Sequence, residues 1–155
     1  MESEFRISET FMLIDYNRIR EEIKILPDVD QICIQGLDED TDPMLGVGRL
    51  NPSEYSEQDF NTFLFDMPHT KEVIEFLGMT RTRVMTMKPK TCYTLHRDNT
   101  PRIHLPLITN DNCKIIIEDF LYHLQADKVY WVNTKKTHTA MNASFESRVH
   151  IVGCT

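Results

Sequence analysis

A histidine and a carboxylate stand two residues apart in segment 94–98, Thr-Leu-His-Arg-Asp. In extended backbone, residues i and i+2 point to the same face, so His96 and Asp98 can approach one ion together. Two histidines and one carboxylate, with coordination positions left open, form the facial triad of non-haem iron(II) oxygenases. His138, on a strand-like segment later in the chain, is the candidate for the second histidine. We therefore predict an iron(II) site made by His96, Asp98 and His138.

A His-x-Asp motif alone is a weak indication, and Arg148 gives it a context. 2-Oxoglutarate chelates iron through its 2-oxo and C1 carboxylate groups, which leaves its far carboxylate to be fixed one molecule-length away. A planar guanidinium matches a carboxylate with two parallel hydrogen bonds. Arg148 lies on the last strand-like segment of the chain, ten residues after the candidate ligand His138. We therefore predict that Arg148 anchors 2-oxoglutarate.

The segment 101–107, Pro-Arg-Ile-His-Leu-Pro-Leu, alternates between two kinds of side chain. Arg102 and His104 share one face, and apolar residues share the other face. A strand that lines a cavity on one side and packs against helices on the other is expected to alternate in this way. The pattern predicts that Arg102 and His104 point into a barrel.

Together, these motifs resemble the aspartyl/asparaginyl β-hydroxylase-like group of 2-oxoglutarate oxygenases, which also includes free-proline hydroxylases. The matching motifs are His96-x-Asp98, Arg102-x-His104-Leu-Pro-Leu, His138 and Arg148-Val-His-Ile-Val. The resemblance covers residues 81–154 and implies a double-stranded β-helix, also called a jelly-roll or cupin-like barrel. It also implies that His104 touches the C1 carboxylate region and that Arg102 meets the cosubstrate or an acidic group on the substrate.

The function that this resemblance implies is hydroxylation of an unactivated C–H bond in an amino acid, peptide or protein side chain. Iron(II), 2-oxoglutarate and O2 are the expected cofactor and cosubstrates. Two alternatives stay open. A cupin-like metalloenzyme without 2-oxoglutarate would not need Arg148, and a non-catalytic binding module on the same barrel would tolerate a weak metal site.

Short strand-like runs recur from residue 81 onward, with turn residues between them. Eight short antiparallel strands suit a jelly-roll barrel. The candidate strands are 81–87, 92–95, 102–107, 113–118, 121–125, 128–132, 137–141 and 148–154.

Residues 1–80 combine helical and strand patterns and are expected to support the barrel as part of a single domain, 1–155. Apolar spacing predicts a helix over 11–26 and a strand over 31–35. A capping-box pattern at Ser56 predicts a short helix that carries Phe60, and Thr70 is the expected cap of another helix that ends at Gly78.

The formal charge of −7 disfavours a nucleic-acid partner, because the surface would repel a phosphate backbone. No apolar run approaches the length of a membrane span, and the first residues are acidic where a secretory signal is basic. The cysteines are widely separated and are expected to be buried free thiols in a reducing compartment. We therefore expect a cytoplasmic protein without a membrane partner.

Overall fold

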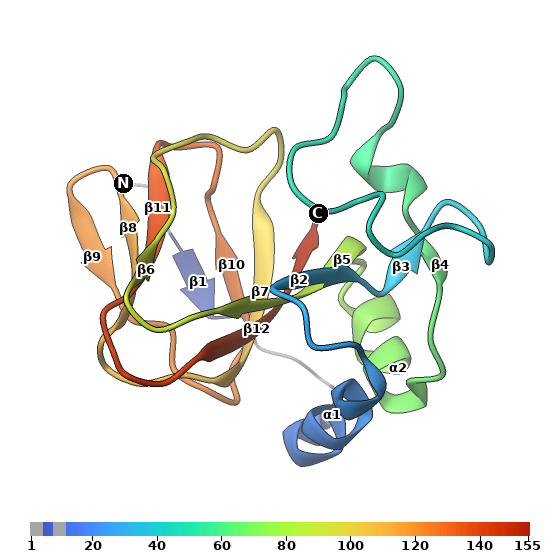
Figure 1. The fold of residues 1–155 in the computed structure, drawn as a ribbon, viewed down its shortest axis with the longest axis horizontal. Helices are drawn as coiled ribbons and strands as arrows, with labels where there is room; N and C mark the ends of the chain where they lie inside the picture. The colour runs from blue at the N-terminus through green and yellow to red at the C-terminus, as the bar shows by residue number, and fades with distance from the viewer. Residues whose placement is uncertain (1–4, 8–11) are drawn as a thin grey trace.

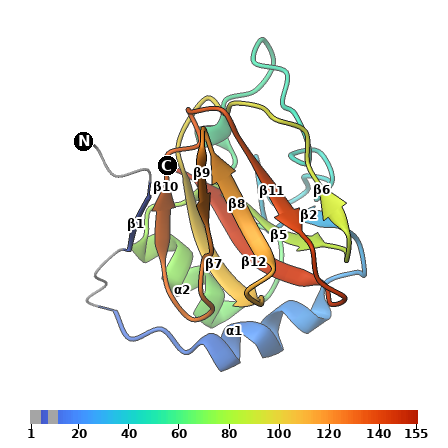
Figure 2. The same ribbon diagram turned by 90° about the vertical axis from the view of Figure 1, so that its left-hand side faces the viewer.

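Two antiparallel sheets face each other in the computed structural model, which describes residues 5–7 and 12–155 (Figures 1 and 2). The acidic start of the chain and the first residue of the predicted helix over 11–26 lie outside the described residues. The larger sheet contains, in spatial order, β1 (Phe5–Ile7), β10 (Tyr130–Val132), β7 (Arg102–Ile108), β12 (Arg148–Cys154), β5 (Thr80–Met87) and β2 (Gln31–Cys33). The smaller sheet contains β6 (Thr91–Cys92), β11 (His138–Asn142), β8 (Cys113–Ile117) and β9 (Phe120–Tyr122).

Each of the eight predicted strands corresponds to one strand from β5 to β12. Chain order and spatial order differ, because successive strands cross from one sheet to the other: β5 lies in the larger sheet, β6 in the smaller, and β7 in the larger again. Eight antiparallel strands in two facing sheets form a jelly roll. The predicted fold class, a mainly β jelly-roll barrel with helices in its first half, is confirmed.

Alternation along the central strands separates two environments. Ile151 of β12, Leu105 of β7 and Val84 of β5 are buried in one apolar cluster with residues of both helices. Since neighbouring side chains on a strand point to opposite faces, the residues between them point toward the smaller sheet. The inward-facing residues of the larger sheet thereby include Arg83, His104 and His150.

Two helices cover the outer face of the larger sheet. The first, α1 (Tyr16–Glu22), begins at the cap residue Asp15 and continues into a 3₁₀ turn, Ile23–Ile25. The second, α2 (Pro68–Phe76), begins at a proline, whose fixed φ suits the first helical position. It is followed by Gly78, whose φ of 65° suits a residue without a side chain. Both predicted helices are therefore present; the first is shorter than predicted, and the second begins earlier than predicted.

The predicted cap Thr70 lies inside α2 instead of at its start. Its backbone N–H and its hydroxyl both donate to a carboxylate oxygen of Glu22 in α1, at 2.8 and 2.6 Å. Thr70 therefore joins the two helices to each other.

The helix predicted after Ser56 is wrong. The capping box is present, but it encloses only a 3₁₀ turn, Glu57–Asp59. The chain then extends so that β4 (Thr62–Phe63) pairs with β3 (Gln35–Gly36). Tertiary pairing overrides the local helical pattern here, because the extended chain gains hydrogen-bond partners that a helix would forgo.

The four cysteines are free thiols, and Cys33, Cys113 and Cys154 are buried as predicted. Cys92 is exposed, which corrects the prediction for that residue, because β6 is an edge strand of the smaller sheet. Among the described residues, no helix has the length and apolar character needed to cross a membrane. The assignment of one domain stays a prediction.

Candidate metal and anion site

A single β-bridge places His96 and His138 opposite each other. The N–H of His96 donates to the carbonyl of His138 at 3.0 Å, and the N–H of His138 donates back at 2.9 Å. Directly opposed residues in an antiparallel pair project to the same face of the sheet, and the two imidazole centroids lie 4.3 Å apart. The backbone thereby brings together two histidines that are 42 positions apart in the sequence.

Asp98 completes the group from the same stretch of chain as His96. Its Oδ1 lies 3.8 Å from Nε2 of His96, and its Oδ2 lies 3.7 Å from Nε2 of His138. The three ligand atoms all fall within 4.8 Å of one another. A carboxylate and two imidazole nitrogens at this spacing can converge on one divalent ion and leave several coordination positions free.

The outer nitrogens of both rings are held by backbone carbonyls. Nδ1 of His96 lies 2.7 Å from the carbonyl of Thr94, and Nδ1 of His138 lies 2.9 Å from that of Lys136. A carbonyl only accepts, so each Nδ1 carries the proton and each Nε2 keeps its lone pair for a ligand bond. Burial also lowers the pKa of His138, which favours the neutral ring that a metal requires. The triad therefore fits a divalent metal in its protonation as well as in its spacing.

Arg102 is engaged with protein groups, and its expected contact with the cosubstrate or substrate stays a prediction. Its Nε lies 3.3 Å from Oδ2 of Asp98, and its two terminal nitrogens donate to the carboxylate of Glu57 at 3.1 and 2.7 Å. One of these nitrogens also donates to Thr100. The side chain of Arg102 therefore orients the candidate ligand Asp98, and few of its donors are left for another molecule.

Glu57 is a buried carboxylate that the sequence pattern did not single out. It accepts hydrogen bonds from Arg102, from Thr100 at 2.7 Å and from Arg81 at 3.0 Å. Burial raises the pKa of Glu57, but hydrogen bonds from Arg102 and Thr100 outweigh it and leave the pKa below its ordinary value. Glu57 therefore connects a turn in the first half of the chain to the candidate metal ligand. Its partners lie 24 and 45 residues away, so local spacing gives no signal for this role.

His104 and His150 form a buried pair inside the barrel. Their Nδ1 atoms lie 3.2 Å apart, so one ring donates and the other accepts. Burial holds the pKa of both rings well below the ordinary value, and the charge of Arg148 lowers both further. The charge of His138 also lowers the pKa of His104, which therefore lies within reach of both the triad and Arg148. This position is compatible with the expected contact between His104 and a ligand that spans from the metal to Arg148.

Arg148 is a buried cation without a partner among the residues that the structure describes. Its exposed fraction is 2%, and its Nε has no hydrogen-bond acceptor. Burial lowers the pKa of Arg148, which means that its charged form is disfavoured by the site as it stands. An isolated buried charge is costly, and a guanidinium does not lose its proton to escape that cost. An anion beside Arg148 would relieve this cost, and the described residues supply none.

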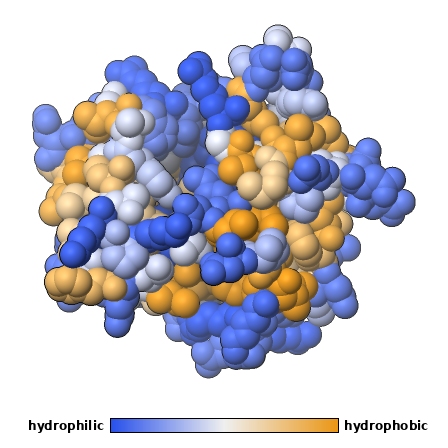
Figure 3. All heavy atoms as spheres, in the orientation of Figure 1, coloured by the Kyte–Doolittle hydropathy of each residue, from blue (hydrophilic) through white to orange (hydrophobic). Residues whose placement is uncertain are grey.

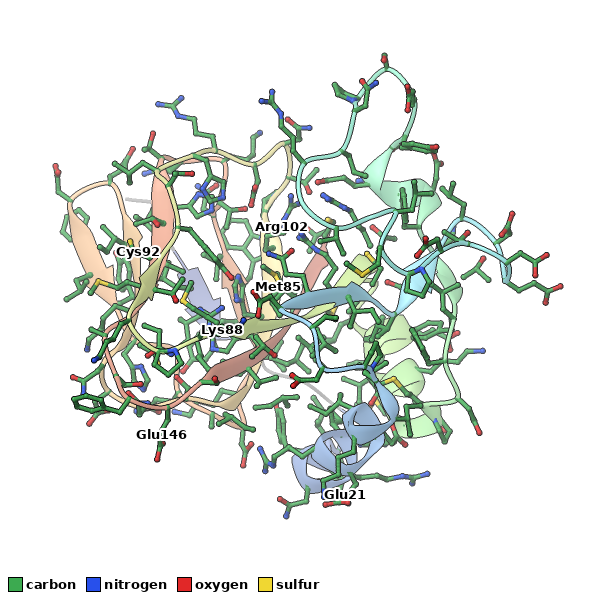
Figure 4. All side chains as sticks on the ribbon, in the orientation of Figure 1. Glu21, Met85, Lys88, Cys92, Arg102 and Glu146 are labelled. Carbon is green, nitrogen blue, oxygen red and sulfur yellow. The ribbon has the colours of Figure 1, made fainter. Side chains whose placement is uncertain are left out.

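These groups lie close to one another between the two sheets. Figure 3 shows a hollow near the centre of the face, bordered mainly by hydrophilic residues. In Figure 4, drawn in the same orientation, Arg102 and Met85 lie in this central region between the two sheets. The structure therefore brings the six predicted residues to one interior. These are His96, Asp98, Arg102, His104, His138 and Arg148.

Comparisons with known proteins agree with this geometry. Residues 50–153, more than half of the chain, match the aspartyl/asparaginyl β-hydroxylase family. A search of curated proteins gave no match. Among solved structures, an oxidoreductase of the 2OG-Fe(II) oxygenase family from Burkholderia pseudomallei is similar in fold, with a TM-score of 0.52 and 14% sequence identity. The similarity covers 88% of this chain and 75% of that one.

A cupin domain from Bordetella pertussis is a more distant match, with a TM-score of 0.42, 14% identity, and coverage of 48% of this chain and 80% of that one. The family match includes the two metal-ligand segments, the strand of Arg102 and the strand of Arg148. The chain therefore belongs to the aspartyl/asparaginyl β-hydroxylase family.

Proposed function

We propose that this protein is an iron(II)- and 2-oxoglutarate-dependent dioxygenase that hydroxylates an unactivated C–H bond of an amino acid, peptide or protein side chain. The observation that carries the proposal is the unpaired, buried Arg148 inside the same barrel as the triad of His96, Asp98 and His138. A metal site alone fits many enzymes. A metal site with a buried cation that lacks an anion fits a cosubstrate with a metal-chelating end and a carboxylate end.

In this proposal the triad holds iron(II) through the two Nε2 atoms and the carboxylate of Asp98. Arg148 would hold the distal carboxylate of 2-oxoglutarate, and His104 would be available to its chelating end. Iron(II) and 2-oxoglutarate supply, together with O2, the oxidising chemistry that attacks an unreactive C–H bond. The chain's own groups bind and orient the reactants and hold both ligand rings by hydrogen bonds at Nδ1.

The hydrogen bonds around Asp98 set its orientation. Arg102 is fixed by Glu57 and Thr100 and presents its Nε to one oxygen of Asp98. Residues that hydrogen-bond to a metal ligand orient it and tune its affinity. Arg102 is therefore assigned a positioning role.

Two other functions, a cupin-like enzyme without 2-oxoglutarate and a non-catalytic binding module, fit the site less well. A cupin-like metalloenzyme that does not use 2-oxoglutarate has no use for an anion at Arg148 and would bury this charge at a cost. A non-catalytic binding module has no use for two histidines held in the tautomer that frees Nε2. The first alternative therefore does not explain the buried charge of Arg148, and the second does not explain the convergence of the two histidines with Asp98.

The test compares 2-oxoglutarate with 2-oxovalerate, which has the same chelating end and chain length but no distal carboxylate. Calorimetry on the anaerobic, iron(II)-loaded protein should show that 2-oxoglutarate binds about tenfold tighter or more, because a charged hydrogen-bonded pair is worth about 1.5–3 kcal/mol. In Arg148→Met the two compounds should bind almost equally. Equal binding to the unaltered protein would sink the proposal.

A further inference from the structure

Arg83 is a second buried arginine without a partner among the described residues. It is 7% exposed, and its Nε has neither a hydrogen-bond acceptor nor contact with solvent. Burial lowers its pKa, and the nearby positive charge of Arg81 lowers it further. The site used by the proposed mechanism explains Arg148 but leaves Arg83 without a role.

The sheet register places Arg83 inside the barrel. Val84, its neighbour on β5, packs in the apolar cluster with the helices, so Arg83 points the opposite way, toward the smaller sheet. Arg83 stands opposite Val152 of β12, and Val152 stands opposite His104 of β7. Two strand spacings of about 4.8 Å therefore separate the backbones of Arg83 and His104, or roughly 10 Å.

Arg83 and Arg148 occupy separate positions along the interior. Arg148 stands opposite Met87, which lies four residues beyond Arg83 on β5. At about 3.4 Å per residue, the two arginines are offset by roughly 14 Å along the sheet. The charges of both arginines lower the pKa of His104, which lies between them, but only Arg148 acts on His150, and only Arg83 has Arg81 and Arg102 as near neighbours. An anion held by Arg148 therefore leaves Arg83 unpaired.

The interior carries more positive charge than the described protein groups neutralise. The larger sheet buries four arginines, and these are Arg81, Arg83, Arg102 and Arg148. Against them stand the buried carboxylate of Glu57, which is already shared by Arg81 and Arg102, and the partly exposed Asp98. A divalent metal ion adds two positive charges, and the two negative charges of 2-oxoglutarate cancel only those two. The remaining excess favours a further anion.

We propose that Arg83 binds a carboxylate of the primary substrate, so that the substrate is a small carboxylic acid that enters the barrel with its acid group toward β5. This inference rests on the proposed function, which makes the barrel interior a substrate site. A guanidinium is suited to a carboxylate, because it offers two parallel donors. The small exposed fraction of Arg83 restricts access to the interior, which favours a small molecule over the side chain of a folded protein.

The experiment follows the arginine Nε–H groups by nuclear magnetic resonance in the full-length protein. Zinc(II), which is diamagnetic and redox-inert, replaces iron, and 2-oxoglutarate is added to saturation. The loaded protein is then titrated with acetate as the probe and with acetamide, its uncharged counterpart, as the control. Arg83→Lys assigns the Arg83 resonance, and contacts with the methyl protons of Val152 assign it independently if that variant does not fold.

We expect the Arg83 Nε–H resonance to shift saturably with acetate. Acetamide should bind about tenfold more weakly or not at all, because it lacks the charge. Absence of a saturable shift with acetate, or an equal response to acetamide, would overturn the inference. The Arg148 resonance reports separately on the proposed function, since it should respond to 2-oxoglutarate before acetate is added. A silent Arg148 beside a responsive Arg83 would reject the cosubstrate assignment and keep the carboxylate site.

Discussion

At the scale of single residues, the barrel interior contains two kinds of buried arginine. Arg102 is neutralised by Glu57 and Asp98, whereas Arg148 has no partner among the described residues. Removal of one partner from a buried ion pair is strongly destabilising, because it leaves an uncompensated charge. Removal of a charge that is already uncompensated should have the opposite effect. The stability of the ligand-free protein therefore distinguishes a structural arginine from one that is kept for a ligand.

Replacement of Arg148 by methionine should raise the free energy of unfolding of the metal-free protein by about 1–3 kcal/mol, because the site loses an unpaired buried charge and keeps its apolar contacts. The matched variant Arg102→Met should lower it by about 3 kcal/mol, since Glu57 and Asp98 lose their partner. Urea unfolding at neutral pH measures both. A clear loss of stability in Arg148→Met would show that this arginine serves the fold.

The buried pair of His104 and His150 predicts a dependence of stability on pH. Burial holds both pKa values well below the ordinary value, so both rings stay neutral in the folded protein. The unfolded chain binds protons as the pH falls through about 6.5, so acid favours unfolding. The free energy of unfolding should fall below that pH, by up to about 1.4 kcal/mol per pH unit for each ring.

Urea titrations of the metal-free protein across the range from about pH 7.5 to 5.5 measure this slope. The variant His150→Gln should show a shallower slope, because one of the two buried rings is gone. An unchanged slope in this variant would mean that other groups carry the pH dependence.

At the scale of elements, strands could be predicted and the network around the site could not. Alternation over 102–107 and 148–154 marks two faces, and it correctly separates Arg102 and His104 from Leu105. This signal is local, because the direction of the side chains along a strand repeats every two residues, whichever strand pairs with it.

The sequence does not predict features that arise where distant segments of the chain meet. The capping box at Ser56 is real, but pairing between β3 and β4 ends the helix after one turn. The contact between Arg102 and Glu57 could not be predicted for the same reason, since Glu57 lies 45 residues earlier in the chain. For Arg83 a local signal existed. It lies two and four residues before Met85 and Met87 on β5, so it shares their face of the strand, and a charged residue on that face is unusual.

The Glu57 turn is predicted to be an energetic link between the first half of the chain and the barrel. Glu57→Gln keeps the shape of the side chain but leaves Arg81 and Arg102 without their shared anion. We expect the free energy of unfolding to fall by about 3 kcal/mol. Glu54→Gln, at an exposed position in the same loop, should change it by no more than about 0.5 kcal/mol. Similar small effects of both substitutions in a denaturation experiment would contradict this link.

At the scale of the whole molecule, the jelly roll brings the candidate site residues together between its sheets. The smaller sheet supplies His138, the chain between β6 and β7 supplies His96 and Asp98, and the larger sheet supplies Arg148. Residues far apart in the sequence become neighbours in the larger sheet, where Tyr130 stands opposite His104 and Arg148 stands opposite Met87, because chain order and spatial order differ. The sequence pattern predicted the barrel and the residue types in it, but the pairing of charges depended on this folding of distant strands onto one interior.

An oxygenase of the proposed kind must bind the metal and the keto acid to one another inside the barrel. The most direct measurement is an anaerobic titration of the iron(II)-loaded protein with 2-oxoglutarate, followed by the weak visible charge-transfer absorption that arises when the keto acid chelates iron. We predict that the absorption forms in the unaltered protein, is lost in His138→Ala, and requires a higher 2-oxoglutarate concentration in Arg148→Met. Iron binding without this absorption would contradict the account and favour a cupin-like enzyme that does not use 2-oxoglutarate.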